Sequence, residues 1–82
     1  DMLFLTLLSP KGKGREATSY LKELKAPQGI TIHDVYSTFG RYDGLIVLEA
    51  PDVKAAMNFV METGFATDYT VETLTAIPVK EL

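Results

Sequence analysis

Few side chains in this sequence could do acid–base chemistry. His33 is the only histidine, and Glu49 and Glu72 lie in segments with the composition of β-strands. An imidazole can exchange a proton near neutral pH, and a carboxylate beside an apolar cavity can act as a general base. We therefore consider five residues as candidates for ligand binding, with no catalytic role assigned to any of them: Thr6, His33, Tyr36, Glu49 and Glu72.

These candidates also have structural interpretations. A lone histidine on an edge strand usually bonds to a neighbouring group, and Glu49 could point to solvent at the end of its strand. A metal site requires several nitrogen or sulfur ligands, whereas this chain has one histidine and no cysteine. We expect neither a metal nor another cofactor. The segment PKGKGR lacks the spacing of a phosphate-binding loop, and no histidine–aspartate pair accompanies Ser9 or Ser37.

The charge of the chain and the length of its apolar run each argue against one class of partner. The formal net charge is −3, and the densest basic stretch holds only Lys11, Lys13 and Arg15, so we expect no nucleic acid to bind. The apolar run at residues 3–8 is too short for a signal peptide or a membrane span. We therefore expect no membrane association and a cytoplasmic location.

The elements that must position the candidates can be predicted along a single domain, residues 1–82. Apolar and β-branched runs predict strands at 2–8, 30–39, 44–50 and 69–77, with a bulge near Asp34, where the alternation of the second strand shifts. Helical spacing predicts helices at 15–25 and from Val53 to Gly64. Asp52 is expected to cap the second helix at its start, and Gly64 at its end. Met57 and Met61 are expected to lie in the core.

This β-α-β-β-α-β order, with a short turn between the second and third strands, predicts a ferredoxin-like α+β fold. Such a fold has a four-stranded antiparallel sheet, with the first and third strands in the centre and both helices on one face. Both faces of the central strands are largely apolar. We therefore expect a second copy of the chain to cover the free face, through Phe4, Leu8, Leu45 and Val47.

The direction of the strands is expected to gather the polar candidates at one end of the sheet. With the first and third strands running one way, Thr6, His33, Glu49 and Glu72 would meet at one end, opposite the turn at residues 40–43. Thr6 and Glu49 would share the face away from the helices. The sequence does not determine which face of the sheet carries His33 or Glu72.

The turn itself, Gly40-Arg41-Tyr42-Asp43, is interpreted as a structural feature of the hairpin, because glycine and aspartate favour turns. The segment GRYDGLIVLEAPD, with VETLTAIP further on, resembles the GYD domain family. The resemblance covers nearly the whole chain and is weakest over residues 9–30. It implies a small ferredoxin-like protein and says little about activity.

A weaker similarity links the same turn to the effector-binding domain of Lrp/AsnC-type regulators and to the wider group of dimeric α+β barrels. Some proteins of that group are small oxygenases, isomerases or decarboxylases. These similarities imply a homo-oligomer, a dimer or larger, that can hold a small-molecule ligand on the open face of its sheet. The alternative that they imply is a small cofactor-independent enzyme with an acid and a base in the same cavity.

Overall fold

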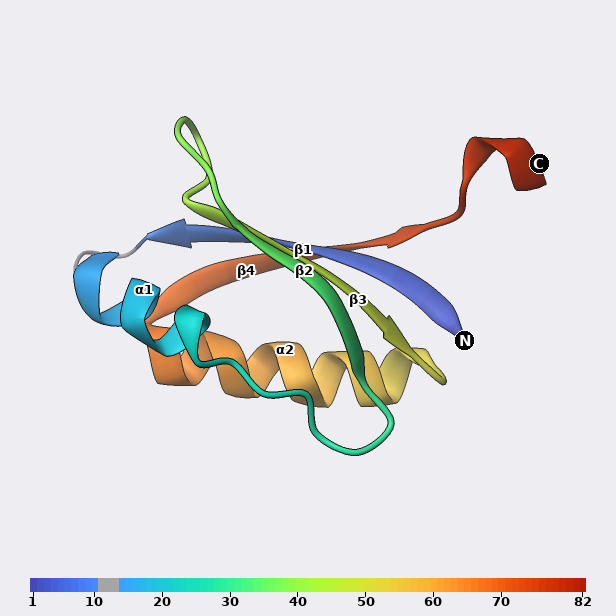
Figure 1. The fold of residues 1–82 in the computed structure, drawn as a ribbon, viewed down its shortest axis with the longest axis horizontal. Helices are drawn as coiled ribbons and strands as arrows, with labels where there is room; N and C mark the ends of the chain where they lie inside the picture. The colour runs from blue at the N-terminus through green and yellow to red at the C-terminus, as the bar shows by residue number, and fades with distance from the viewer. Residues whose placement is uncertain (11–13) are drawn as a thin grey trace.

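A computed structural model describes residues 1–10 and 14–82 and has the predicted order of elements (Figure 1). The basic stretch and the glycine-rich loop of the sequence fall mainly on residues 11–13, outside the described residues. The elements are β1 (Met2–Pro10), α1 (Gly14–Lys22), β2 (Thr31–Ser37), β3 (Gly44–Ala50), α2 (Val53–Thr67), β4 (Tyr69–Ala76) and a final 3₁₀ turn, η1 (Val79–Glu81).

The four strands form one sheet in the order β2-β3-β1-β4, and every neighbouring pair is antiparallel. Both helices lie on one side of this sheet, whereas the tip of the β2–β3 hairpin and the C-terminal end rise on the other side (Figure 1). The ferredoxin-like fold predicted from the sequence is thereby confirmed. The predicted strand direction is wrong: β1 and β3 are direct neighbours, and therefore run in opposite directions.

The hairpin between β2 and β3 has the predicted bulge. The register pairs Ile32 with Leu48 and Asp34 with Val47, so His33 is the extra residue between them. A bulge leaves one residue without an opposite partner and turns its side chain out of the strict alternation. The bulge therefore allows the His33 side chain to turn toward the neighbouring strand β3.

The core lies between the sheet and α2. Alternate residues of the central strands are buried, as expected for a half-covered sheet. They pack against Ala56, Phe59 and Val60 of α2, and Leu21 and Leu24 pack against the edge of this cluster from the side of α1. The buried side chains of β1 and β3 include Phe4, Thr6, Leu8, Ile46, Leu48 and Ala50.

The ends of α2 agree only in part with the sequence prediction. The Asp52 carboxylate accepts a hydrogen bond of 2.8 Å from the Ala55 N–H, which confirms the predicted N-cap. The predicted end at Gly64 is wrong, because the helix continues to Thr67 and Asp68 adopts the left-handed conformation, with φ of 59°. Thr63 and Thr67 are buried, so packing extends the helix past the glycine.

The expected burial of Met57 and Met61 is also wrong. Their side chains are 55% and 50% exposed, because the buried face of α2 is formed by Ala56, Phe59, Val60 and Thr63 instead. Helical spacing alone gives the width of an apolar stripe without its orientation, and here the stripe is wider than the sheet can cover.

Candidate functional site

The face of the sheet away from the helices, called the open face below, has an apolar centre. In the register, residues directly opposite each other share a face, so the pairing of Leu5 with Val47 and of Leu7 with Leu45 places all four together. Leu3 and Leu74 extend the same apolar area. The residues of the two central strands on this face are half-buried.

The register corrects the expected composition of this face. Thr6 lies opposite Ile46 on the helix-covered face and is fully buried, with its hydroxyl 3.0 Å from that of Thr73. Phe4 and Leu8 belong to the core for the same reason. The alternation of each strand was predicted correctly, but the face that each set occupies depends on the register between β1 and β3, which the sequence alone does not fix.

His33 and Glu49 are brought together on the open face. The Nε2 of His33 lies 2.7 Å from Oε1 of Glu49, and the two side chains are 42% and 37% exposed. The bulge at His33 makes this contact possible, because Glu49 itself lies opposite Leu3 and Thr31. This pair lies at the end of the sheet away from the turn, as predicted for both residues.

Glu72 lies at the other end, which contradicts the expected cluster of four polar residues. It pairs with Leu7, and its carboxylate accepts a hydrogen bond of 2.9 Å from the hydroxyl of Tyr42. This hydrogen bond, assisted by partial desolvation and by the negative charge of Glu72, raises the pKa of the Tyr42 phenol, and Arg41 opposes the shift. The antiparallel direction of β1 and β3 explains why Glu49 and Glu72 are separated.

The Gly40–Asp43 turn is held mainly by backbone contacts. The Asp43 N–H donates to the Leu8 carbonyl at 2.8 Å, and the Thr38 N–H donates to the Asp43 carbonyl at 2.9 Å. The Thr38 hydroxyl donates to the Tyr42 carbonyl at 2.6 Å, and the Arg41 guanidinium lies 5.7 Å from the centre of the Tyr42 ring. These contacts agree with a structural role for the turn.

The remaining candidate, Tyr36, lies opposite Leu45 near the turn, and its side chain is 51% exposed. It therefore lies toward the turn, away from the contact between His33 and Glu49. The structure brings together His33 and Glu49 alone among the five candidates, and it adds Tyr42 as the partner of Glu72.

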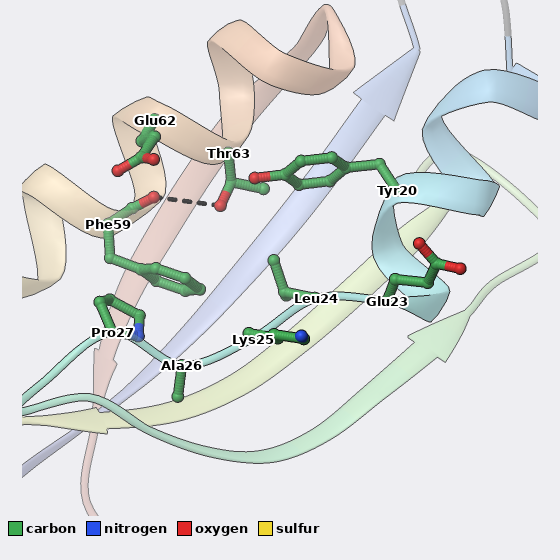
Figure 2. A pocket seen from close by; sticks show the side chains of 9 residues that line it. All are labelled: Tyr20, Glu23, Leu24, Lys25, Ala26, Pro27, Phe59, Glu62 and Thr63. Atoms are coloured by element: carbon green, nitrogen blue, oxygen red, sulfur yellow. Dashed lines mark hydrogen bonds between the residues drawn. The ribbon is translucent and has the colours of Figure 1, made fainter.

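One surface hollow lies beside the His33–Glu49 pair, and another lies on the helix-covered side of the molecule. The first, of about 520 Å³, lies next to Glu49 on the open face and is also lined by Leu3, Ile77 and Glu81. The other, of about 410 Å³, lies between α2 and the segment after α1 (Figure 2). Tyr20 and Phe59 line this second hollow, where the Thr63 hydroxyl donates to the Phe59 carbonyl at 3.0 Å. Sequence reasoning missed it, although the early helix end before Pro27 was a usable signal.

Two further properties concern metal ions and membrane spans. Within residues 1–10 and 14–82, no group of three or more histidine, aspartate or glutamate side chains lies close enough to hold a metal ion. In the same part of the chain, no helix has the length and apolar character needed to cross a membrane. The titratable groups that the structure places at the open face are an imidazole, carboxylates and phenols around an apolar surface.

The architecture defines a class, the ferredoxin-like α+β domains with one helix-covered and one free sheet face. The family model for the GYD domain matches residues 6–82 of the sequence. The chain therefore belongs to the GYD domain family. No curated protein matches the sequence.

Several solved structures share the fold. The leucine response regulatory protein LrpA of Mycobacterium tuberculosis has a TM-score of 0.74 at 9% identity, over 95% of this chain and 51% of LrpA. The hypothetical protein PHS023 of Pyrococcus horikoshii has a TM-score of 0.71 at 18% identity, over 95% and 92% of the two chains. TTHA0845 of Thermus thermophilus has a TM-score of 0.70 at 24% identity, over 96% of each chain. This chain spans about half the length of LrpA.

Proposed function

We propose that this protein acts as a homodimeric module in which the open faces of two copies pack together and enclose a small-ligand site. The observation that supports this most is the apolar centre of the open face, formed by Leu3, Leu5, Leu7, Leu45 and Val47. An antiparallel sheet with a face toward water normally alternates apolar and polar residues. Here both faces of the central strands are apolar, so the open face has the composition of an interface.

The size of this face supports the same proposal. Strands of seven residues, four abreast, make a face of roughly 20 by 19 Å, close to the area of an exposed apolar patch that marks an interaction site. Each Å² of apolar surface removed from water contributes about 25 cal/mol. A domain of this size gains little stability from its own core, so a contribution from the second copy is significant.

The ligand site is proposed for the hollow next to Glu49, because it combines an apolar wall with converging polar groups, as ligand sites do. Leu3 and Ile77 supply the apolar wall, and Glu49 and Glu81 supply carboxylates. A ligand with an apolar body and a hydrogen-bond donor or positive group would fit this chemistry. Closure of the dimer would exclude water from the site and strengthen each polar contact.

The close contact of His33 with Glu49 favours a second candidate function. In a desolvated cavity, a carboxylate that orients an imidazole can support general acid–base catalysis. The pair is partly exposed and stands beside the hollow rather than inside a closed pocket. We therefore rank a cofactor-independent enzyme below the binding module.

Replacing Leu5 by lysine tests the dimer, because it introduces a charge at the centre of the open face. Sedimentation velocity at micromolar concentration should show the particle mass halved relative to the unaltered protein. Asn58→Lys, with the same added charge on the exposed side of α2, should leave the mass unchanged. An unaltered protein that sediments as a single chain, or a Leu5→Lys variant of unchanged mass, would refute the proposal.

Native mass spectrometry of the freshly purified protein tests the ligand site. A retained small molecule should be lost in Glu49→Gln and kept in Glu72→Gln, because Glu49 lines the hollow and Glu72 does not. For the second candidate, a His33→Gln variant should accumulate an unconverted form of that molecule with a different mass. Equal retention in both glutamine variants would place the ligand elsewhere.

A further inference from the structure

An apolar groove of about 330 Å³ runs along the outer edge of the molecule, between α2 and β4. Phe4, Ala56 and Val60 line it from the core, whereas Met57 and Met61 line it from α2. The exposed side chains Val53, Met57, Met61 and Phe65 recur at every fourth residue of α2. They form a continuous stripe along one side of the helix, and methionine-rich surfaces of this kind adapt readily to a partner.

The strand beside this groove has a free edge. β4 is the last strand of the sheet, and among the described residues no strand pairs with its outer side. Natural sheets protect such edges with charged side chains, above all lysine, and with proline, bulges or very short strands. β4 is eight residues long, has a regular register with β1, is rich in threonine, and contains neither proline nor lysine. Its one charged residue, Glu72, is bonded to Tyr42. The edge of β4 is therefore open to pairing with another strand.

We infer that β4 pairs antiparallel with β4 of a second copy about a two-fold axis at Thr73. The apolar stripes on the α2 helices of the two copies would then meet across the axis. This interface differs from the open face proposed above and does not depend on it. It extends the sheet to eight strands and covers Met57 and Met61, whose exposure the core does not explain.

The register follows from geometry and charge. In an antiparallel pair, two opposite residues either both direct their backbone N–H and C=O groups toward the partner strand or both direct them away. Neighbouring residues of one strand alternate in this respect, so they cannot be opposite each other in a symmetric pair. The two-fold axis must therefore pass through a residue and not between two residues. An axis at Glu72 would place two carboxylates directly opposite each other, which is unfavourable. An axis at Leu74 would bring Pro78 opposite Thr70. Only the axis at Thr73 pairs residues 70–76 completely, with Thr73 opposite itself.

The position of Glu72 is compatible with this register. Glu72 would lie opposite Leu74 of the second copy, so the two carboxylates are not direct neighbours. Its bond to Tyr42 also directs the carboxylate over the sheet toward the turn, away from the outer edge. Thr73 opposite Thr73, and Val71 opposite Thr75, are pairs that suit adjacent strands. A second copy of this chain is therefore the occupant that matches both the edge and the groove.

Because the chain has no cysteine, single cysteines report the register directly. In the Thr73→Cys variant, the two cysteines would lie about 4.5–5.5 Å apart between Cα atoms, within disulfide range. In Thr75→Cys they would be about 14 Å apart, beyond that range. Under mild oxidation, Thr73→Cys should form a covalent dimer, whereas Thr75→Cys should stay a single chain. Failure of a folded Thr73→Cys variant to cross-link, or equal cross-linking of both variants, would overturn the inference.

A second pair of variants covers the case in which loss of the Thr73–Thr6 contact prevents folding. Val71→Cys mixed with Thr75→Cys should cross-link, because these positions are opposite in the same register, and each alone should not. Met57→Glu should slow this cross-linking roughly tenfold or more, whereas Asn58→Glu, on the neighbouring exposed position, should not. Equal effects of these two substitutions would exclude the groove from the interface.

The open-face dimer can be tested independently in the same assay. Leu5→Lys should leave the cross-linking at residue 73 unchanged, since Leu5 lies on the open face and not at the β4 edge. If Leu5→Lys does not halve the mass in sedimentation, the proposed open-face module is refuted and the cross-linking result is unaffected. If Thr73→Cys does not cross-link in a protein that otherwise has the unaltered mass, only the edge pairing is refuted.

Discussion

At the scale of single residues, Tyr42 links the β2–β3 turn to β4 through Glu72, and this contact predicts a dependence of stability on alkaline pH. The native state holds the phenolic proton more tightly than the unfolded chain does, because the pKa of Tyr42 is raised mainly by its bond to Glu72. The resulting stabilisation is complete below the ordinary tyrosine pKa of about 10. It is lost as the pH rises through the raised pKa of the native state.

We therefore expect the free energy of unfolding to fall above about pH 10, and to fall less steeply in Tyr42→Phe and in Glu72→Gln. Burial also raises the pKa of Tyr69, with a further contribution from Asp43, so part of the decline should persist in both variants. Urea denaturation at a fixed protein concentration, across alkaline pH, measures this difference. Parallel curves for Tyr42→Phe and the unaltered protein would show that the bond has no effect.

Gly29 gives a second prediction at this scale. Its φ is +90°, and no atom lies within 4 Å of a Cβ built at this position, so the strain of the backbone is the only obstacle to a side chain. Gly29→Ala should lower the free energy of unfolding by about 1 kcal/mol. Gln28→Ala, at the preceding exposed position, should change it little. A stabilised Gly29→Ala variant would show that the loop relaxes into another conformation.

At the scale of elements, replacing Gly64 in α2 is expected to stabilise the protein, in contrast to Gly29→Ala. Gly64 lies inside the helix, and a Cβ there would meet the Tyr69 carbonyl and Val71 at 3.5 Å, which is ordinary contact. Gly64→Ala should therefore raise the free energy of unfolding by up to about 1 kcal/mol. Asp68→Gly should also stabilise, since Asp68 holds the left-handed conformation at the helix end. Destabilisation by Gly64→Ala would favour the helix end predicted from the sequence.

The elements also show how far the sequence determines the structure. The order of elements along the chain, the hairpin, the bulge and the Asp52 cap were all predictable, because each depends on local periodicity or on one side chain. The shared face of Thr6 and Glu49 was not, because it depends on the register between β1 and β3, which are separated by about half the chain. His33 and Glu49 were predicted to be close, while their hydrogen bond through the bulge was not.

The exposure of Met57 and Met61 was not predictable either, because it too depends on packing between elements that are distant in the sequence. An apolar stripe indicates which residues could be buried, but the sheet covers only part of the stripe on α2. The remainder faces the edge of β4, where no described element packs against it. Met57 and Met61, predicted to be buried but found exposed, therefore mark an apolar surface beside β4. The sequence alone does not distinguish this surface from the core.

At the scale of the whole molecule, the two proposed interfaces differ in what they cover. In the proposed open-face dimer, side-chain packing would cover the sheet and leave the hydrogen bonds between strands as they are. Pairing at β4 instead provides partners for backbone N–H groups on its outer edge. The two edge strands are a natural internal comparison, because β2 ends the sheet on the other side and has no proposed partner.

Amide hydrogen exchange can therefore separate the two interfaces in one experiment. At low protein concentration, the outward-facing amides of β2 and β4 should exchange at similar, fast rates, while those of β1 and β3 are protected by neighbours on both sides. At high concentration, alternate amides of β4 should slow markedly, centred on Thr73, and those of β2 should not. Met57→Glu should remove the slowing, and Leu5→Lys should leave it in place. Equal slowing in β2 and β4, or none in either, would show that β4 is not an edge used in assembly.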